Sequence, residues 1–185
     1  MDRKIVVVLA IAIVAIVAGL ALTSGNKGTG NTTPEAKWHV GDFIEWTWYQ
    51  APLNTTTGGD VYIIMRYTLV AVDSELITLN FTQMDAARDV TYSTEYDVLA
   101  NSTTFLSRTS VSLGGSGINV TDMGPEVISM PQRTVTAEHY VWTYLILEET
   151  FHSDIYEVNG IFVKMIGHGN EYTVIVETTD TNIQF

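Results

Sequence analysis

The sequence predicts an all-β extracytoplasmic domain preceded by one N-terminal transmembrane helix. From Trp38 onward, apolar and polar residues alternate with a period of two, as they do in strands whose two faces differ. The alternating runs are rich in Val, Ile, Thr, Tyr and Trp, the residue types enriched in strands. The first 23 residues instead hold an unbroken apolar run. We expect antiparallel strands that follow one another as a meander, rolled into a sandwich, a half-barrel or a barrel.

The N-terminal apolar run, residues 5–22, contains no charged or polar side chain. As a helix rising about 1.5 Å per residue it would cover roughly 27 Å, close to the ~30 Å of a bilayer core. Arg3 and Lys4 precede the run, so the positive-inside rule places the N-terminus in the cytoplasm and the rest of the chain outside. The run is longer than the apolar part of an ordinary signal peptide. An uncleaved anchor is therefore favoured over a signal peptide cleaved near residues 19–23.

Three segments are expected along the chain. Residues 1–23 form the transmembrane anchor or signal segment. Residues 24–36 consist mainly of Gly, Ser, Thr, Asn and Pro without apolar periodicity, the composition of a flexible tether. Residues 37–185 are long enough for one domain with its own core, but short for two.

Roughly nine strands are expected in this domain. They are residues 43–49, 60–72, 75–82, 89–99, 103–113, 134–151, 154–158, 161–166 and 171–183. In residues 43–49 the two tryptophans share one face, which should be the core face. That face carries Ile44, Trp46 and Trp48, and the other carries Phe43, Glu45, Thr47 and Tyr49. The β-branched and aromatic content of residues 134–151 favours a strand over a helix there.

The turns follow from Gly, Asn, Asp and Ser between the strands. Tight turns at residues 73–74, 100–102 and 159–160 should each join two strands as a hairpin. The strongest of these is Asn159-Gly160, because Asn-Gly readily supplies the two positive φ angles of a type I′ turn. A further turn is predicted at residues 167–170. Residues 114–133, with four Gly and two Pro, should form the longest irregular connection.

Composition excludes several classes of protein. With 46% hydrophobic and 16% charged residues the chain should fold rather than remain disordered. It carries 9 Lys and Arg against 21 Asp and Glu, a net charge of −12, so its surface should repel nucleic acid. The chain has no cysteine, which excludes disulfides, thiol nucleophiles, cysteine zinc sites and a lipidated cysteine.

Short motifs resemble those of one group of proteins. These are Val40-Gly41-Asp42 followed by Trp46, the hairpin of residues 159–165, and the closing run of residues 171–183. They resemble motifs of uncharacterised membrane-anchored or secreted β-rich surface proteins of archaea. The curved sheets of those proteins are in turn similar to the half-barrels of lipoprotein carriers, an analogy of fold that does not imply lipid transport. The resemblance implies a cell-surface β domain and brings no catalytic residues with it.

Glycosylation is the modification that the sequence suggests. Five of the nine asparagines open Asn-x-Ser/Thr sequons. The candidates are Asn31, Asn54, Asn80, Asn101 and Asn119. All but Asn80 fall in predicted tether, turn or loop segments, where a glycan can be accommodated. Ordinary polar turn residues are the alternative interpretation.

Metal binding and catalysis have little support. Of four histidines, only His152 has a second potential ligand, Asp154, on the same face of its strand, and a metal site would need a third ligand supplied by the fold. The histidines are therefore expected to be isolated surface or turn residues. The acid pairs, Asp42 with Glu45 and Glu148 with Glu149, are interpreted as solvated charges at strand ends. No nucleophile elbow, dinucleotide-binding or P-loop motif is present. We expect no catalytic, cofactor or metal-binding residues.

Aromatic residues are the remaining candidates for a binding surface. Such residues could line a groove for sugars, peptides or lipid, although core packing explains them as well. The set is Trp38, Trp46, Trp48, Tyr49 and Tyr62.

The expected function is that of a non-enzymatic cell-surface module, held at the membrane by its N-terminal helix. Its domain should be monomeric, and its partner an envelope protein, a glycan or a lipid. One alternative is a subunit of an extracellular filament that assembles by strand exchange, but residues 24–36 lack the apolar alternation that a donated strand needs. The other alternative is a weak metal-dependent enzyme.

Overall fold

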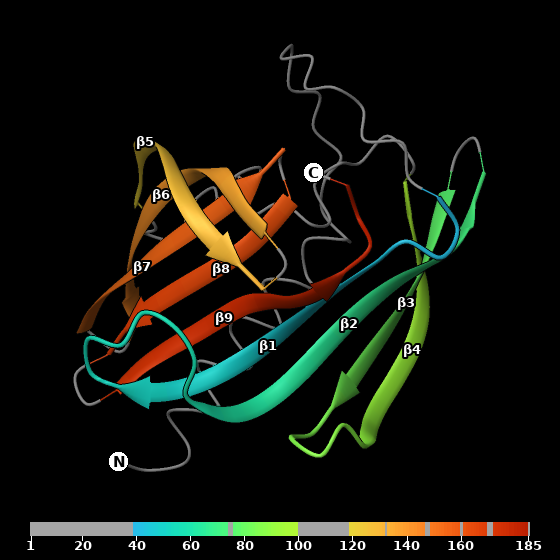
Figure 1. Cartoon of the computed structure of the whole chain (residues 1–185), viewed down its shortest axis with the longest axis horizontal. Helices are drawn as coiled ribbons and strands as arrows, with labels where there is room; N and C mark the ends of the chain where they lie inside the picture. The colour runs from blue at the N-terminus through green and yellow to red at the C-terminus, as the bar shows by residue number, and fades with distance from the viewer. Residues whose placement is uncertain are drawn as a thin grey trace.

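The computed structural model describes seven stretches of the chain. They are residues 39–73, 76–99, 119–131, 133–146, 149–159, 161–169 and 172–184. Within them the protein is all-β, as predicted, with nine strands (Figure 1). The strands are β1 (Phe43–Pro52), β2 (Asp60–Val72), β3 (Leu76–Met84), β4 (Val90–Leu99), β5 (Asn119–Met130), β6 (Arg133–Ile146), β7 (Glu149–Val158), β8 (Ile161–His168) and β9 (Tyr172–Thr181).

The predicted membrane helix lies outside the described residues. Within the described stretches, no helix has the length and apolar character that crossing a bilayer requires. The predicted tether, residues 24–36, also lies outside them.

The nine strands form a single antiparallel sheet in the order β4-β3-β2-β1-β9-β8-β7-β6-β5. The first and last strands pair with each other at its centre, and β4 and β5 lie at its two edges (Figure 1). Among the described strands the sheet is open, because β4 and β5 at its two edges are not paired with each other. The expected meander is therefore correct within β1–β4 and within β5–β9, but these two halves are joined through β1 and β9.

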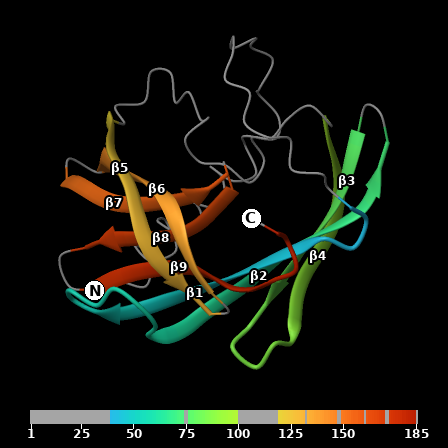
Figure 2. The ribbon, with the colours of Figure 1, turned by 45° about the horizontal axis from the view of Figure 1, so that its top comes forward.

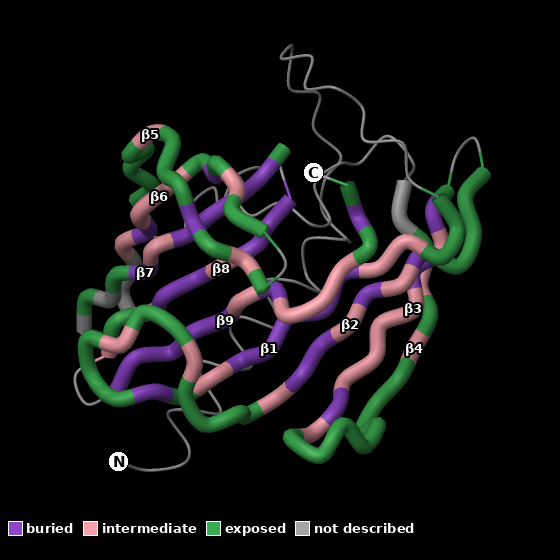
Figure 3. Tube along the Cα trace, in the orientation of Figure 1, coloured by how far each residue is buried: buried purple, intermediate pink, exposed green. Residues whose placement is uncertain are grey.

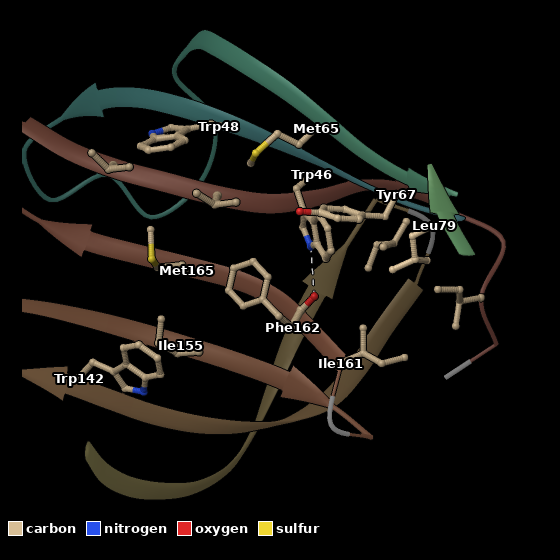
Figure 4. Close-up of a cluster of buried hydrophobic side chains, with 14 of the residues drawn as sticks. Trp46, Trp48, Met65, Tyr67, Leu79, Trp142, Ile155, Ile161, Phe162 and Met165 are labelled. Atoms are coloured by element: carbon tan, nitrogen blue, oxygen red, sulfur yellow. Dashed lines mark hydrogen bonds between the residues drawn. The ribbon is translucent and has the colours of Figure 1, made fainter. Parts of the chain in front are cut away.

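The sheet curves, so that side chains from its two halves meet on one side, here called the inner face (Figures 2 and 4). The main hydrophobic cluster lies there, with Trp46 and Trp48 from β1 and Trp142 from β6 among its largest members. The predicted core face of β1 is therefore confirmed: Ile44, Trp46 and Trp48 are 1%, 5% and 2% exposed. Buried residues gather on the central strands β1, β9 and β8 (Figure 3).

Beyond the residues of β6 that pair with β7, the β5–β6 hairpin leaves this curved sheet and covers part of its opposite side, the outer face. From Glu138 onward β6 pairs with β7, whereas its first residues pair only with β5. The free end of the hairpin reaches the segment that follows β9, where Nη2 of Arg133 donates to the carbonyl of Ile183 at 2.9 Å. Beneath the hairpin lies a second apolar cluster, the outer cluster. Its buried members are Ile128, Ala137, Tyr156, Val158, Val163 and Ile166.

The prediction of an irregular connection over residues 114–133 is wrong for its second half, which is strand β5. Gly and Pro are typical of loops, and their presence in this segment led to the prediction of a loop instead of a strand. Gly124, with φ of 81°, lies at an irregularity in the pairing of β5 with β6, and Pro125 follows it. At a sheet edge a bulge and a missing N–H are both tolerated, because one side of the strand has no ladder to break.

Two other boundaries differ from the sequence-based expectation. Residues 134–151 were expected as one run, but β6 ends at Ile146 and β7 begins at Glu149, and the two strands pair directly. The chain between the two strands, Leu147-Glu148, contains no Gly, Pro, Asn or Asp, so no typical turn residue marks the boundary. In addition, β8 continues to His168, into the turn predicted at residues 167–170.

The hairpin of β7 and β8 is confirmed. Val158 pairs with Ile161, and Asn159 between them has φ of 51°. The hairpin of β2 and β3 is confirmed as well, with the backbone N–H of Asp73 donating to the carbonyl of Leu76 at 2.9 Å. The predicted strand 103–113, and with it the hairpin across residues 100–102, lies outside the described residues.

Candidate functional site

An array of aromatic rings crosses the inner face from the core to a sheet edge. Trp46 on β1 contacts Tyr67 on β2, with ring centroids 5.4 Å apart. Tyr67 contacts Phe81 on β3 at 4.9 Å, and Phe81 contacts Tyr92 on β4 at 6.2 Å. Tyr96, also on β4, meets Tyr67 edge to face at 6.4 Å. We call these five rings the aromatic array.

Exposure increases along the aromatic array. Trp46 is 5% exposed, Phe81 is half-buried, and Tyr92 at the edge strand is 53% exposed. Burial raises the pKa of the Tyr96 hydroxyl, and the neighbouring hydroxyl of Tyr67 adds to the increase. The array therefore presents an aromatic surface to solvent at Tyr92, whereas its other end, at Trp46, is packed in the core.

Buried indole N–H groups also lie on the inner face. The indole N–H of Trp46 donates to the carbonyl of Phe162 at 3.1 Å (Figure 4). Nε1 of Trp142, in contrast, is buried and has no hydrogen-bond partner among the described residues.

The outer face carries a buried carboxylate. Glu45 on β1 is 1% exposed. Its Oε2 lies 2.7 Å from Nη2 of Arg88 and 3.1 Å from Nε of Arg66, and Oε1 accepts from the hydroxyl of Thr179 at 3.3 Å. The Arg66 guanidinium also pairs with Asp180 at 3.2 Å. The expectation that Glu45 is a solvated charge at a strand end is therefore wrong, because the fold brings two arginines to it.

Sequence could not show these partners because they come from separate elements. Arg66 lies directly opposite Glu45 in the register of β1 and β2. Arg88 lies in the turn between β3 and β4. A negatively charged residue between Ile44 and Trp46, in the middle of an apolar strand, was the one sign in the sequence that Glu45 needed a partner.

The outer face also holds a network of histidines and carboxylates, here called the histidine network. Nδ1 of His139 lies 2.9 Å from Oε2 of Glu126, and its Nε2 lies 2.8 Å from Oδ1 of Asp154. The other carboxylate oxygen of Asp154 lies 2.8 Å from Nε2 of His168. The ring of His139 stacks on that of Tyr156, with centroids 4.5 Å apart and planes at 16°.

The pKa of Tyr156 is raised to about 12 in this environment. Burial is the largest cause, and the negative charges of Glu126 and Asp154 add to it. The Tyr156 hydroxyl therefore keeps its proton, and its ability to donate a hydrogen bond, to a higher pH than an ordinary tyrosine.

The expectation for the histidines is correct only in part. His152 is exposed, and its Nδ1 lies 3.1 Å from the hydroxyl of Thr143. His168 is exposed but bonded to Asp154. His139 is not an isolated surface residue, since it is 14% exposed and both its ring nitrogens face carboxylates. Within the described stretches, no three His, Asp or Glu side chains are arranged to hold a metal ion.

The glycosylation candidates lie in different settings. Asn54 is exposed in the turn after β1, with φ of 64°. Asn80 lies within β3, where its Oδ1 accepts from Ser93 at 3.1 Å and from Thr82 at 3.2 Å. Asn119 is exposed and begins β5, rather than lying in a loop. Asn31 and Asn101 lie outside the described residues, and glycosylation stays a prediction at all five sites.

The aromatic candidates divide between core and surface. Trp46 and Trp48 belong to the main cluster. Tyr62 is 44% exposed and contacts Trp48 at 6.0 Å, and Tyr49 is half-buried on the other face of β1. Trp38 lies outside the described residues. The sequence analysis missed Tyr67, Phe81, Tyr92 and Tyr96, because only the pairing of β2, β3 and β4 brings these rings together.

Comparisons with known proteins found likenesses of structure only. No family model matches the sequence, and no curated protein matches it. One similar crystal structure is a protein from Bacteroides fragilis with a YmcC-like fold, inferred to be exported. It is 13% identical, with a TM-score of 0.48, over 78% of this chain and 96% of that one.

A second similar structure is a protein from Parabacteroides distasonis inferred to be a lipoprotein. It is 11% identical, with a TM-score of 0.49, over 78% of this chain and 96% of that one. Likeness at this level concerns the path of the chain and says nothing of what this protein binds. Both neighbours are bacterial, so they add no support to the resemblance to archaeal proteins.

Proposed function

We propose that this protein is a non-enzymatic binding module of the cell surface, held at the membrane by its N-terminal helix, with its β domain outside. The anchoring and the location are supported by the apolar run of residues 5–22 and by Arg3 and Lys4 before it. The binding role is supported by the aromatic array. Its exposed end at Tyr92 is the observation that carries the proposal.

The array suits a ligand with an apolar face. Aromatic side chains offer large contact areas at a low cost in conformational entropy, and each stacked pair of rings adds about 0.5–1.5 kcal/mol beyond the area it buries. Tyr92 stands on a scaffold of rings that ends at the buried Trp46, so it is held in place before a ligand arrives. Such preorganisation lowers the entropic cost of binding.

The charge of the protein further limits the class of ligand that the array could bind. The described cations are Arg66, Arg88, Arg133 and Lys164, and each bonds within the fold. With a net charge of −12 the surface favours neutral or cationic ligands over anionic ones. We therefore propose a neutral ligand with an apolar face, such as a glycan or a zwitterionic lipid.

The test uses two soluble probes of this kind. The full chain, held in amphipol, would be titrated calorimetrically with chito-oligosaccharide and with a short-chain lysophosphatidylcholine below its micelle concentration. We expect saturable binding of one probe, weakened about tenfold by Tyr92→Ala, which corresponds to roughly 1.4 kcal/mol. The matched control is Val127→Ala, at an exposed apolar residue of the opposite edge strand, and it should bind as the wild type does. Failure of both probes to bind, or equal affinity of Tyr92→Ala and wild type, would contradict the proposal.

A further inference from the structure

The β5–β6 hairpin is fastened to the outer face at two places. At its free end, Arg133 donates to the carbonyl of Ile183. Where β6 joins the sheet, His139 is bonded on one side to Glu126 of the hairpin strand β5 and on the other to Asp154 of β7. The outer cluster lies between the hairpin and the sheet, so these contacts add to the apolar packing that holds the hairpin there.

The two contacts of His139 require a particular protonation state. A neutral imidazole has one donor nitrogen and one acceptor nitrogen, and only the imidazolium donates from both. Ionised carboxylates only accept. The Nε2 contact with Asp154 is a hydrogen bond and the Nδ1 contact with Glu126, at 2.9 Å, is an ion pair, so both contacts are favourable only when His139 carries the additional proton. His168 makes one such contact, which a neutral ring protonated at Nε2 satisfies.

We propose that His139 is a proton-dependent clasp that fastens the β5–β6 hairpin to the outer face of the sheet. With His139 protonated, the ring bridges Glu126 and Asp154. When His139 loses its proton to solvent, one contact sets a nitrogen lone pair against a carboxylate oxygen. That contact becomes repulsive, the hairpin loosens, and the outer cluster becomes accessible. The proposal is independent of the ligand proposed for the aromatic array.

The charged groups around His139 support this assignment. Glu126 faces it from β5, Asp154 and Tyr156 from β7, and His168 is reached through Asp154 from β8. Lys164, opposite Tyr156 in the register of β7 and β8, forms its ion pair with Glu177 on β9 at 3.6 Å. In this set His139 is the group that contacts both Glu126 and Asp154.

Hydrogen–deuterium exchange tests the clasp through the hairpin itself. Exchange of residues 119–139 would be followed by mass spectrometry in the full chain, in detergent, between pH 5.5 and 8.5. This interval covers the range in which histidines titrate. After correction for the intrinsic effect of pH on exchange, opening of the hairpin should become at least about tenfold more frequent at pH 8.5 than at pH 5.5. Release of one proton permits up to about tenfold per pH unit. Strand β1 serves as the internal reference and should not change.

Matched variants separate the clasp from a general effect of pH. His139→Gln should abolish the pH dependence of hairpin exchange, because glutamine does not titrate. His152→Gln, at an exposed histidine of the same face whose ring lies against the Thr143 hydroxyl, should keep the wild-type pH dependence. Should His139→Gln fail to fold, Glu126→Gln tests the same claim, because an amide can donate to or accept from Nδ1 and so reduces the pH dependence.

Three results would overturn the clasp. The first is a wild-type hairpin whose exchange does not change with pH. The second is a His139→Gln or Glu126→Gln variant that keeps the full pH dependence. The third is protection of the hairpin by added zinc at pH 8.5 that is lost in His139→Gln, because His139 would then be a metal ligand.

Discussion

Arg88, in the turn between β3 and β4, places its Nη2 2.7 Å from Oε2 of Glu45 on β1, across the intervening strand β2. Arg88 has φ of 69°, in the left-handed region that non-glycine residues rarely adopt. Asp85 shapes this turn, since its Oδ1 accepts from the backbone N–H groups of Ala87 and Asp89. The strained turn therefore brings a cation to a carboxylate that would otherwise be buried with Arg66 alone.

Two substitutions of Arg88 should separate the contribution of its ion pair to stability from the cost of its left-handed φ angle. Arg88→Ala should lower the free energy of unfolding by about 1–3 kcal/mol, because a buried carboxylate loses a charged partner while Arg66 remains. Arg88→Gly loses the same ion pair but relieves the left-handed φ, so it should be about 1 kcal/mol more stable than Arg88→Ala. Urea unfolding followed by tryptophan fluorescence measures both. A glycine variant less stable than the alanine variant would show that the turn is unstrained.

A positive φ angle should also make the turn between β7 and β8 sensitive to substitution. Asn159 has φ of 51°, which asparagine tolerates and a β-branched residue does not. We expect Asn159→Val to cost about 1–2 kcal/mol and Asn159→Gly to change stability little. Thermal unfolding of the two variants is the measurement. Equal melting temperatures for Asn159→Val and wild type would contradict the assignment of this turn.

Tyr156 predicts a loss of stability at alkaline pH. Folding raises the pKa of its hydroxyl from the ordinary tyrosine value of 10.0 to about 12. The stabilisation is fully present below pH 10 and is lost as the pH rises through about 12, because only the unfolded chain releases the proton in between. Tyr156→Phe should lose less stability than the wild type between pH 10 and 12. Denaturant unfolding at a series of pH values measures the free energy of unfolding of both proteins. An equal decrease of that free energy between pH 10 and 12 in Tyr156→Phe and wild type would contradict the raised pKa.

The oligomeric state discriminates between a surface module and a filament subunit. Fragments Lys37–Phe185 and Ser24–Phe185 should both be monomers at micromolar concentration. The reason is that residues 24–36 lack the apolar alternation of a donated strand and the negative charge opposes association. Light scattering is the measurement. Polymers that form only with residues 24–36 present would favour the filament.

Much of the fold could be predicted because period-two alternation and turn residues are local signals. They predicted β2, the core face of β1 and the hairpin at Asn159. The register between distant strands is not local. The sequence does not predict the pairing of β1 with β9 or the contact of His139 with Asp154. Each of these joins residues of different strands, and a local pattern does not show which strands pair or in which register. For the same reason Glu45 was mistaken for a solvated charge. Its neighbours along the chain gave no sign of Arg66 and Arg88.

We propose that the N-terminal helix holds an external β domain at the membrane. This topology can be tested by adding protease to intact cells, with mass analysis of what remains. We expect the β domain to be removed while an N-terminal fragment containing residues 5–22 stays with the membrane. Full protection of the domain, or a mature chain that begins near Leu22 or Ser24, would contradict it.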